Sequence, residues 1–202
     1  MKTKPVVFFR DGTLIRQDGG CVPASFGVYT AEEPFFSPGN AERVLEEKAA
    51  QGVNFLLLVL GQTAVAEAPE VYDEALLARL REILKFAEGK QIAVVLYLKP
   101  DASAESRAAY TETAAHTARR VKDCAALCGF VLPSGSSAEF SAAFAARFAA
   151  KHPFLQFFAA PGADLPEAAC TAEPETAETK NAGSFVPPQY WPEAWTGVLA
   201  GF

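Results

Sequence analysis

The sequence predicts one α/β domain in which parallel strands alternate with helices, as they do in an open doubly wound sheet or a (β/α) barrel. Two observations predict this class. Several short apolar runs contain no polar alternation, which is typical of strands covered on both faces. The segments between them show helical periodicity. With 202 residues, 50% of them hydrophobic, the chain is long enough to bury one core, and no linker or repeat divides residues 1–202.

The first half of the chain shows the alternation most clearly. Residues 38–51 are predicted to form a helix that Gly52 ends, and residues 53–60 form a continuous apolar strand. Asp73 is placed to cap the next helix. The apolar positions of that helix have the spacing of a single buried stripe and are Leu76, Leu77, Leu80, Ile83, Leu84 and Ala87. Residues 92–98 are the next buried strand.

The second half continues the pattern, and both ends of the chain add irregular segments. Helices are expected at residues 104–124 and 138–151, and strands at 128–133, 154–159 and 185–190. In the second of these helices Phe140, Phe144 and Phe148 share one face, which favours packing against the sheet. Residues 162–184 are rich in Ala, Glu, Thr and Pro and are expected to form a flexible loop. Near the N-terminus, residues 5–20 are expected to form a hairpin that turns at Asp11-Gly12.

Composition excludes several classes of partner. The net charge of −6, with only 18 dispersed Lys and Arg residues, argues against binding to nucleic acid or to an anionic membrane. The longest apolar run, residues 53–60, is far shorter than the ~20 residues of a membrane-spanning helix. Residues 1–4 resemble the start of a signal peptide, but no apolar core of ~7–15 residues follows them. We therefore expect a cytoplasmic protein.

The cysteines and histidines predict neither a disulfide framework nor a metal site. Cys21, Cys124, Cys128 and Cys170 are too sparse for a disulfide scaffold in a chain of this length. Cys124 and Cys128 lie four residues apart, but no second cysteine pair or histidine accompanies them. The sequence therefore favours structural thiols and indicates no cofactor.

The order of motifs resembles that of a known enzyme family. Gly52-Val53-Asn54 precedes an apolar strand, Pro69-Glu70-Val71-Tyr72-Asp73 precedes a Leu-rich helix, and another apolar strand follows it. Further on, Gly129-Phe130-Val131-Leu132 and Pro188-Gln189-Tyr190-Trp191-Pro192 fit a fourth strand and the end of a sixth. Over residues 39–192 the chain resembles cellulase-like and endoglycoceramidase-like glycoside hydrolases of family five. The resemblance implies a TIM-barrel-like fold, incomplete here, with about six parallel strands.

The polar positions that the resemblance maps have all changed. Leu57 stands in place of the family's arginine on strand two, and Lys99 in place of the histidine on strand three. Ser134 or Gly135 replaces the acid/base glutamate, and Gln189 replaces the histidine on strand six. A retaining glycosidase needs two carboxyl groups ~5–5.5 Å apart. The second belongs on strand seven, for which the dozen or so residues after Gln189 are expected to be too few, since a helix and a strand need ~20.

The resemblance and its departures together imply a non-catalytic relative, a binding or structural module built on a degenerate barrel. No catalytic residue is assigned. Ligands of barrels sit at the carboxyl ends of the strands. The candidate ligand-binding residues are therefore Gln62, Lys99, Asp101, Ser134, Gln189, Tyr190 and Trp191. The implied ligand is a carbohydrate or a glycolipid. Because an incomplete barrel leaves its interior and its strand edges open, a second copy of the chain is also expected to close it.

Two alternatives remain open at this stage. The first is an active glycosidase in which a segment outside this sequence, or another subunit, completes the site and Glu67, Glu70 or Glu139 serves as the acid. The second is a phosphatase, because residues 6–14 resemble the first motif of haloacid dehalogenases. Such a phosphatase would depend on Asp11, because Phe9 occupies the position of the family's nucleophilic aspartate.

A serine-rich loop is a weaker signal. Residues 134–137 resemble a phosphate loop, but Ser136 followed three residues later by Glu139 better matches a helix capping box.

Overall fold

The main sheet has the strand order of a barrel. In the computed structural model, which describes residues 7–10, 12–16, 19–100, 107–166, 185–186, 195 and 199, six strands pair in parallel in the order β11-β10-β9-β8-β5-β4. They are β4 (Phe26–Ala31), β5 (Phe55–Gly61), β8 (Ala93–Lys99), β9 (Leu127–Leu132), β10 (Gln156–Ala159) and β11 (Phe185–Val186). Their spatial order follows the chain order in one direction. A doubly wound sheet reverses direction at a switch point, so the structure selects the incomplete barrel.

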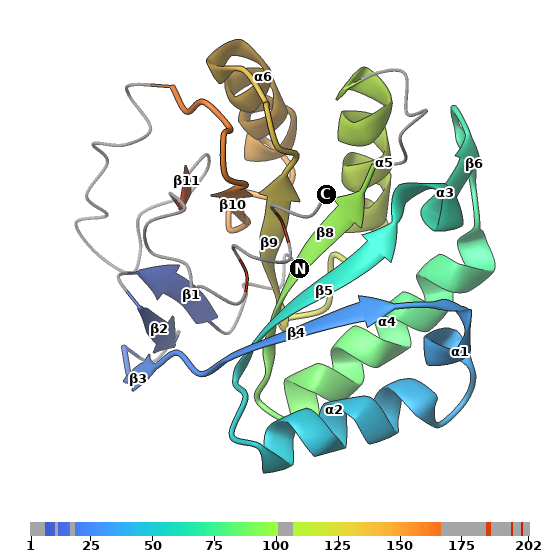
Figure 1. Ribbon diagram of the computed structural model, residues 1–202, viewed down its shortest axis with the longest axis vertical. Helices are drawn as coiled ribbons and strands as arrows, with labels where there is room; N and C mark the ends of the chain where they lie inside the picture. Colours follow the sequence, from blue (N-terminus) through green and yellow to red (C-terminus); the bar gives the residue numbers. More distant parts are fainter. Residues whose placement is uncertain are drawn as a thin grey trace.

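Helices connect these strands and lie together along one side of the sheet (Figure 1). The long ones are α2 (Asn40–Ala50), α4 (Glu74–Gly89), α5 (Arg107–Arg120) and α6 (Ala138–Ala149), and the short ones are α1 (Glu33–Phe36) and α3 (Gln62–Val65). A small antiparallel hairpin, β6 (Ala66–Ala68) with β7 (Val71–Tyr72), precedes α4. The four long helices and the strands that follow them were predicted. The first barrel strand β4, the helices α1 and α3 and this hairpin were not.

Local sequence explains where the helices begin. Asp73 caps α4, its Oδ1 accepting a hydrogen bond of 2.8 Å from the amide of Leu76, as predicted. At α6 the prediction was wrong by one residue. Ser137, and not Ser136, is the N-cap and accepts from the amide of Phe140, while the hydroxyl of Ser136 donates to the carbonyl of Pro133. The serine-rich loop is therefore a helix start.

The buried strands carry two different cores on their two faces. Along β5, Leu56, Leu58 and Leu60 pack against the helices, while Phe55, Leu57 and Val59 face the other side, the interior of the incomplete barrel. Side chains of a strand alternate between its faces, so a strand covered on both faces is apolar throughout. Position 129 on β9 needs a glycine because a Cβ there would lie 1.9 Å from the carbonyl oxygen of Gln156 on β10.

The N-terminal hairpin covers the interior face. Strands β1 (Val7–Arg10), β2 (Thr13–Arg16) and β3 (Cys21–Pro23) form a separate antiparallel sheet, so the hairpin predicted around Asp11-Gly12 is confirmed on both sides of the turn, although Asp11 itself lies outside the described residues. The ring of Phe9 stacks on Phe55 with centroids 5.2 Å apart. The hairpin lies opposite the helices across the sheet (Figure 1).

Two polar contacts attach distant segments to this interior. The side-chain amide of Gln156 accepts from the amide of Phe9 at 2.7 Å and donates to its carbonyl at 2.9 Å. The indole of Trp195, 1% exposed, donates to the carbonyl of Gly27 on the edge strand β4 at 3.0 Å. Segments of the chain itself thus pack on the interior face. The sheet still ends at β4 and β11 among the described residues, and the expectation of a second copy stays a prediction.

No helix among the described residues is long and apolar enough to cross a membrane. The predicted loop at residues 162–184 is described only as far as Pro166, and of the strand predicted at residues 185–190 only Phe185 and Val186 are described.

Candidate functional site

Three predicted site residues lie at the carboxyl edge of the main sheet, where barrels bind ligands. Gln62 follows β5, Lys99 ends β8 and Ser134 follows β9, and these strands are neighbours in the sheet. In the register of β5 and β8, Gly61 lies opposite Lys99. The other four predicted residues, Asp101, Gln189, Tyr190 and Trp191, lie outside the described residues.

These three side chains differ in their surroundings. The hydroxyl of Ser134 donates to the carbonyl of Pro161 at 3.0 Å, which ties the end of β9 to the end of β10. Lys99 is half-buried, two residues after Tyr97 and therefore on the interior side of β8. Gln62 is only 7% exposed, and its Oε1 has no hydrogen-bond partner among the described residues. A buried amide oxygen without a partner is costly, so Gln62 has an unused acceptor near this edge, below the surface of the described residues.

Below this edge the interior face is apolar. Leu57, which stands where the family-five resemblance expects an arginine, is fully buried among side chains such as Phe55 and Val59. Burial raises the pKa of Tyr97 on β8 to about 12. The phenol therefore stays neutral at ordinary pH and is no proton acceptor. Below the level of Lys99, the described residues of this face are packed apolar side chains.

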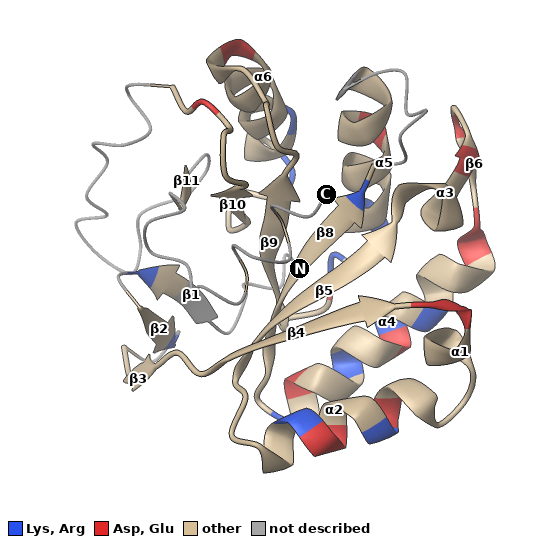
Figure 2. Ribbon diagram, viewed as in Figure 1, with Lys and Arg blue, Asp and Glu red and all other residues tan. Residues whose placement is uncertain are grey.

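Charged groups lie outside the sheet. Figure 2 shows Asp, Glu, Lys and Arg over the helices and connecting segments, and Lys99 is the one charged residue in the described strands of the main sheet. Of the carboxylates considered as substitute acids, Glu67 and Glu70 belong to the β6–β7 hairpin, and Glu139 lies in the first turn of α6. None of them is on a strand of the main sheet.

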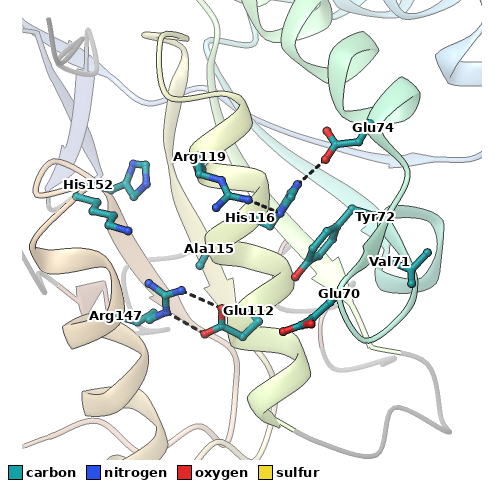
Figure 3. Close-up of a pocket in the computed structure, with 11 residues that line it drawn as sticks. Glu70, Val71, Tyr72, Glu74, Glu112, Ala115, His116, Arg119, Arg147 and His152 are labelled. Carbon is teal, nitrogen blue, oxygen red and sulfur yellow. Dashed lines mark hydrogen bonds and ion pairs between the residues drawn. The ribbon is translucent and has the colours of Figure 1, made fainter.

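A second region with charged groups is a cavity of about 640 Å³ on the helical side. The β6–β7 hairpin, the start of α4, and the helices α5 and α6 form its walls (Figure 3). We call it the outer pocket. Its residues come from segments up to 82 positions apart in the chain, from Glu70 to His152. The sequence analysis gave it no role.

His116 is the centre of one wall of the outer pocket. Its Nε2 lies 2.9 Å from Oε1 of Glu74, and Arg119 donates to its Nδ1 at 2.7 Å. Its ring stacks on Tyr72, with centroids 3.6 Å apart and planes inclined by 19° (Figure 3). Burial lowers the pKa of His116, although Glu74 opposes this. The ring is therefore neutral at pH 7. Its Nδ1 faces Arg119, and its Nε2 lies between Oε1 of Glu74 and the Nε of Arg120, which is 3.3 Å away.

This arrangement makes His116 a connector between helices. Both ring nitrogens already have partners, so neither a free lone pair nor a free proton remains for general acid or base catalysis. Sequence reasoning found no partner for His116 because Glu74 lies 42 residues away in the chain. The only sequence signal was the run of basic residues one turn further along the same helix.

The opposite wall contains an ion pair between helices α5 and α6. Arg147 donates two hydrogen bonds of 2.9 Å to the two carboxylate oxygens of Glu112. Arg147 lowers the pKa of Glu112, and Arg119 and Lys151 act in the same direction. Three positive charges therefore surround this carboxylate.

The described residues contain no group of three or more His, Cys, Asp or Glu side chains that could hold a metal ion. Cys124 and Cys128 are buried thiols outside any disulfide, and burial raises the pKa of each to about 12. Both therefore stay protonated at ordinary pH, while Cys170 lies outside the described residues.

Comparisons with known proteins identify the fold. No protein-family model matches the chain, and no curated protein sequence is similar to it. Among solved structures, an endocellulase from Pyrococcus horikoshii in complex with cellotetraose superimposes with a TM-score of 0.56 at 14% identity, covering 79% of this chain and 58% of that one. An endoglucanase Cel5A from Pseudomonas stutzeri, in complex with cellobiose, gives 0.54 at 15% identity, with 68% and 50% covered.

An exo-β-1,4-mannosidase from the Opitutaceae bacterium strain TAV5 gives a TM-score of 0.59 at 16% identity, covering 78% of this chain and 34% of that one. The chain thus spans about half, or less, of the length of these enzymes. At such identities the likeness shows the fold alone. The chain has a family-five glycoside-hydrolase-like barrel fold in an incomplete form.

Proposed function

We propose that this protein is a non-catalytic member of the glycoside-hydrolase-like folds that binds a carbohydrate at the carboxyl edge of its sheet. The observation that carries the proposal is the interior face. There, aromatic and aliphatic side chains from the strands, the N-terminal hairpin and Trp195 pack together. A glycosidase needs a pair of carboxyl groups at this place. At the end of β9, where the acid/base residue would stand, Ser134 is bonded to a backbone carbonyl.

Binding at this edge is supported by the groups that it offers. Gln62 has an amide oxygen without a partner, and Lys99 provides a cation on the neighbouring strand. Hydroxyl groups of sugars donate to amide oxygens and accept from ammonium groups. Several structural neighbours were solved with cellotetraose, cellobiose or GlcNAc. These sugars are therefore suitable first probes.

The test combines binding and turnover on one sample. Calorimetric titration with cellotetraose, cellobiose and GlcNAc should show heat of binding, and the same protein should release no product from these sugars or from aryl glycosides. Lys99→Gln should weaken binding, while Lys48→Gln, on α2 away from this edge, should not. Absence of binding to every sugar would contradict the proposal. Turnover that Glu70→Gln or Glu139→Gln abolishes would instead establish an active enzyme.

The proposed sugar binding does not require a second copy, since the hairpin and Trp195 already pack on the interior face. Light scattering tests the separate prediction of a second copy, and a molar mass near 21.6 kDa, that of one chain, would contradict that prediction. A dimer that loses sugar binding when it dissociates would contradict the independence of binding from a second copy.

A further inference from the structure

The outer pocket contains more positive charge on its α5–α6 side than its ion pairs use. Arg147 pairs with Glu112, and Glu74 pairs with Arg120. Arg119 donates to the neutral ring of His116 and forms no ion pair with a carboxylate among the described residues. The ammonium group of Lys151 forms no hydrogen bond or ion pair within the same set of residues. Two cations are thus left without a carboxylate partner.

These cations converge on one place. Arg119 comes from α5, and Arg147 and Lys151 come from the end of α6 and the residues after it, yet all three act electrostatically on the carboxylate of Glu112. Figure 3 shows the guanidinium groups of Arg119 and Arg147 on the two sides of the space between the helices. Three positive charges face Glu112, and Glu70 lies beside that carboxylate (Figure 3), so the local excess is one positive charge.

One further carboxylate lies in the same cavity. Glu70, on the β6–β7 hairpin, forms no ion pair among the described residues, and it lies beside Tyr72 and Glu112 (Figure 3). It has a positive φ of 63°, which is uncommon for a residue other than glycine. Val71 next to it is 53% exposed. The hairpin therefore provides an apolar surface beside the cationic side of the pocket.

We infer that the outer pocket is a second binding site, which takes a phosphate group carried by a small organic molecule. A phosphate monoester has a charge of about −1.5 to −2 at pH 7 and three acceptor oxygens, so it can engage Arg119, Arg147 and Lys151 together, whereas a carboxylate offers only two oxygens. Guanidinium groups with free N–H donors are well suited to phosphate oxygens. A cavity of about 640 Å³ holds more than the ion, and Tyr72 and Val71 provide contacts for the rest of the molecule.

The ligand would use donors that the native contacts leave free. Arg119 uses its Nη2 for His116, and Arg147 uses Nε and Nη2 for Glu112, so each guanidinium retains further N–H groups. The ammonium of Lys151 contributes up to three more. Binding therefore does not require the two ion pairs of the pocket to break. This site is independent of the proposed sugar site at the edge of the sheet.

Calorimetric titrations at low ionic strength test the inference with inorganic phosphate, glycerol 3-phosphate and acetate. Glycerol 3-phosphate should bind most tightly, and acetate most weakly. Lys151→Gln and Arg119→Gln should each weaken glycerol 3-phosphate binding by about tenfold or more, because each removes a charge-assisted hydrogen bond. Glu70→Gln should leave binding equal or tighter. The matched control is Lys48→Gln, which removes the same charge on α2 and should have no effect.

The outcomes separate the possible sources of the group. Inorganic phosphate that binds as tightly as the ester would support the site and show that it recognises the ion alone. Acetate that binds as tightly as glycerol 3-phosphate would overturn the choice of phosphate. A wild-type protein that binds neither phosphate, or a loss in Lys48→Gln equal to that in Lys151→Gln, would overturn the site itself. Urea unfolding of each variant checks that a loss of binding is not a loss of folding.

Discussion

The interior face of the sheet and the outer pocket use opposite means to join distant segments. On the interior face, rings from the N-terminal hairpin, the strands and Trp195 pack together, and the two polar contacts are made to backbone groups. In the outer pocket, the segments are joined by ion pairs at the surface, such as Glu112 with Arg147. The difference separates the contacts that stabilise the fold from the charged groups that remain available to a ligand. The interior stabilises the fold, whereas the pocket contributes little stability and offers its charges to a ligand.

The largest expected effect is that of removing the ring which closes the interior. Trp195→Ala should lower the free energy of unfolding by about 3–5 kcal/mol, because a fully buried indole is replaced by a cavity. Urea denaturation measures it. Trp195→Phe keeps most of the packing and loses the hydrogen bond to Gly27, so its cost should be nearer 1 kcal/mol. Equal costs for the two variants would show that the hydrogen bond, and not the packing, joins this segment to the sheet.

A second variant sharpens the comparison by removing a polar contact from the apolar face. Gln156→Leu keeps the volume but leaves the amide and carbonyl of Phe9 without their partners in a buried place. The expected loss is about 2 kcal/mol or more, since each unsatisfied buried group costs about 1–3 kcal/mol. Hydrogen exchange at the amide of Phe9 should accelerate in the same variant. An unchanged rate there would mean that the hairpin is attached by its rings alone.

The outer pocket should respond to pH. Because the pKa of His116 lies below its usual value near 6.5, the unfolded chain binds more protons in the window just below that pH. The free energy of unfolding should therefore fall as the pH is lowered through this window. Arg120, with a smaller contribution from His116, lowers the pKa of Glu74. The free energy of unfolding should therefore fall a second time as the pH drops below about 4.5.

The comparison of wild type with His116→Gln measures the first of these losses. Urea unfolding gives the free energy of unfolding at pH 7.5 and at pH 5.5. The difference between the two values should be smaller in the variant, because a glutamine side chain is not protonated in this range. A titration of the His116 ring by NMR provides the independent check. A midpoint at or above 6.5 would contradict the neutral ring that connects Glu74 to Arg119.

The smallest effect is expected at the surface ion pair between α4 and the end of α5. Arg81 donates to both carboxylate oxygens of Asp123, but both side chains are largely exposed. Arg81→Gln should cost about 0.2–1 kcal/mol, and the cost should shrink further at high salt. A loss as large as that of Gln156→Leu would break the comparison, because a surface charge would then stabilise the fold as much as the interior does.

The sequence by itself determined the elements whose cause is local. The apolar strand at residues 53–60, the cap at Asp73 and the hairpin around Gly12 each depend on neighbours in the chain. The structure confirms the cap and the hairpin, and it begins the strand two residues later, at Phe55. The same local logic missed β4, whose residues Phe26–Ala31 are half-buried and mixed in polarity. Gln62, Lys99 and Ser134 lie at the ends of β5, β8 and β9, as the sequence predicted, because strand ends in a parallel sheet meet at one edge, and their part in ligand binding stays a prediction.

Only the tertiary structure decided what covers the interior and where the charges gather. Gln156 meets Phe9 across 147 residues, Trp195 meets Gly27 across 168, and His116 meets Glu74 across 42. No periodicity in the sequence records such contacts, because each depends on how the whole chain closes on itself. The neighbours of a residue in the sequence determine whether it lies in a helix or a strand. The chemical environment of its side chain is determined by partners that folding brings from elsewhere in the chain.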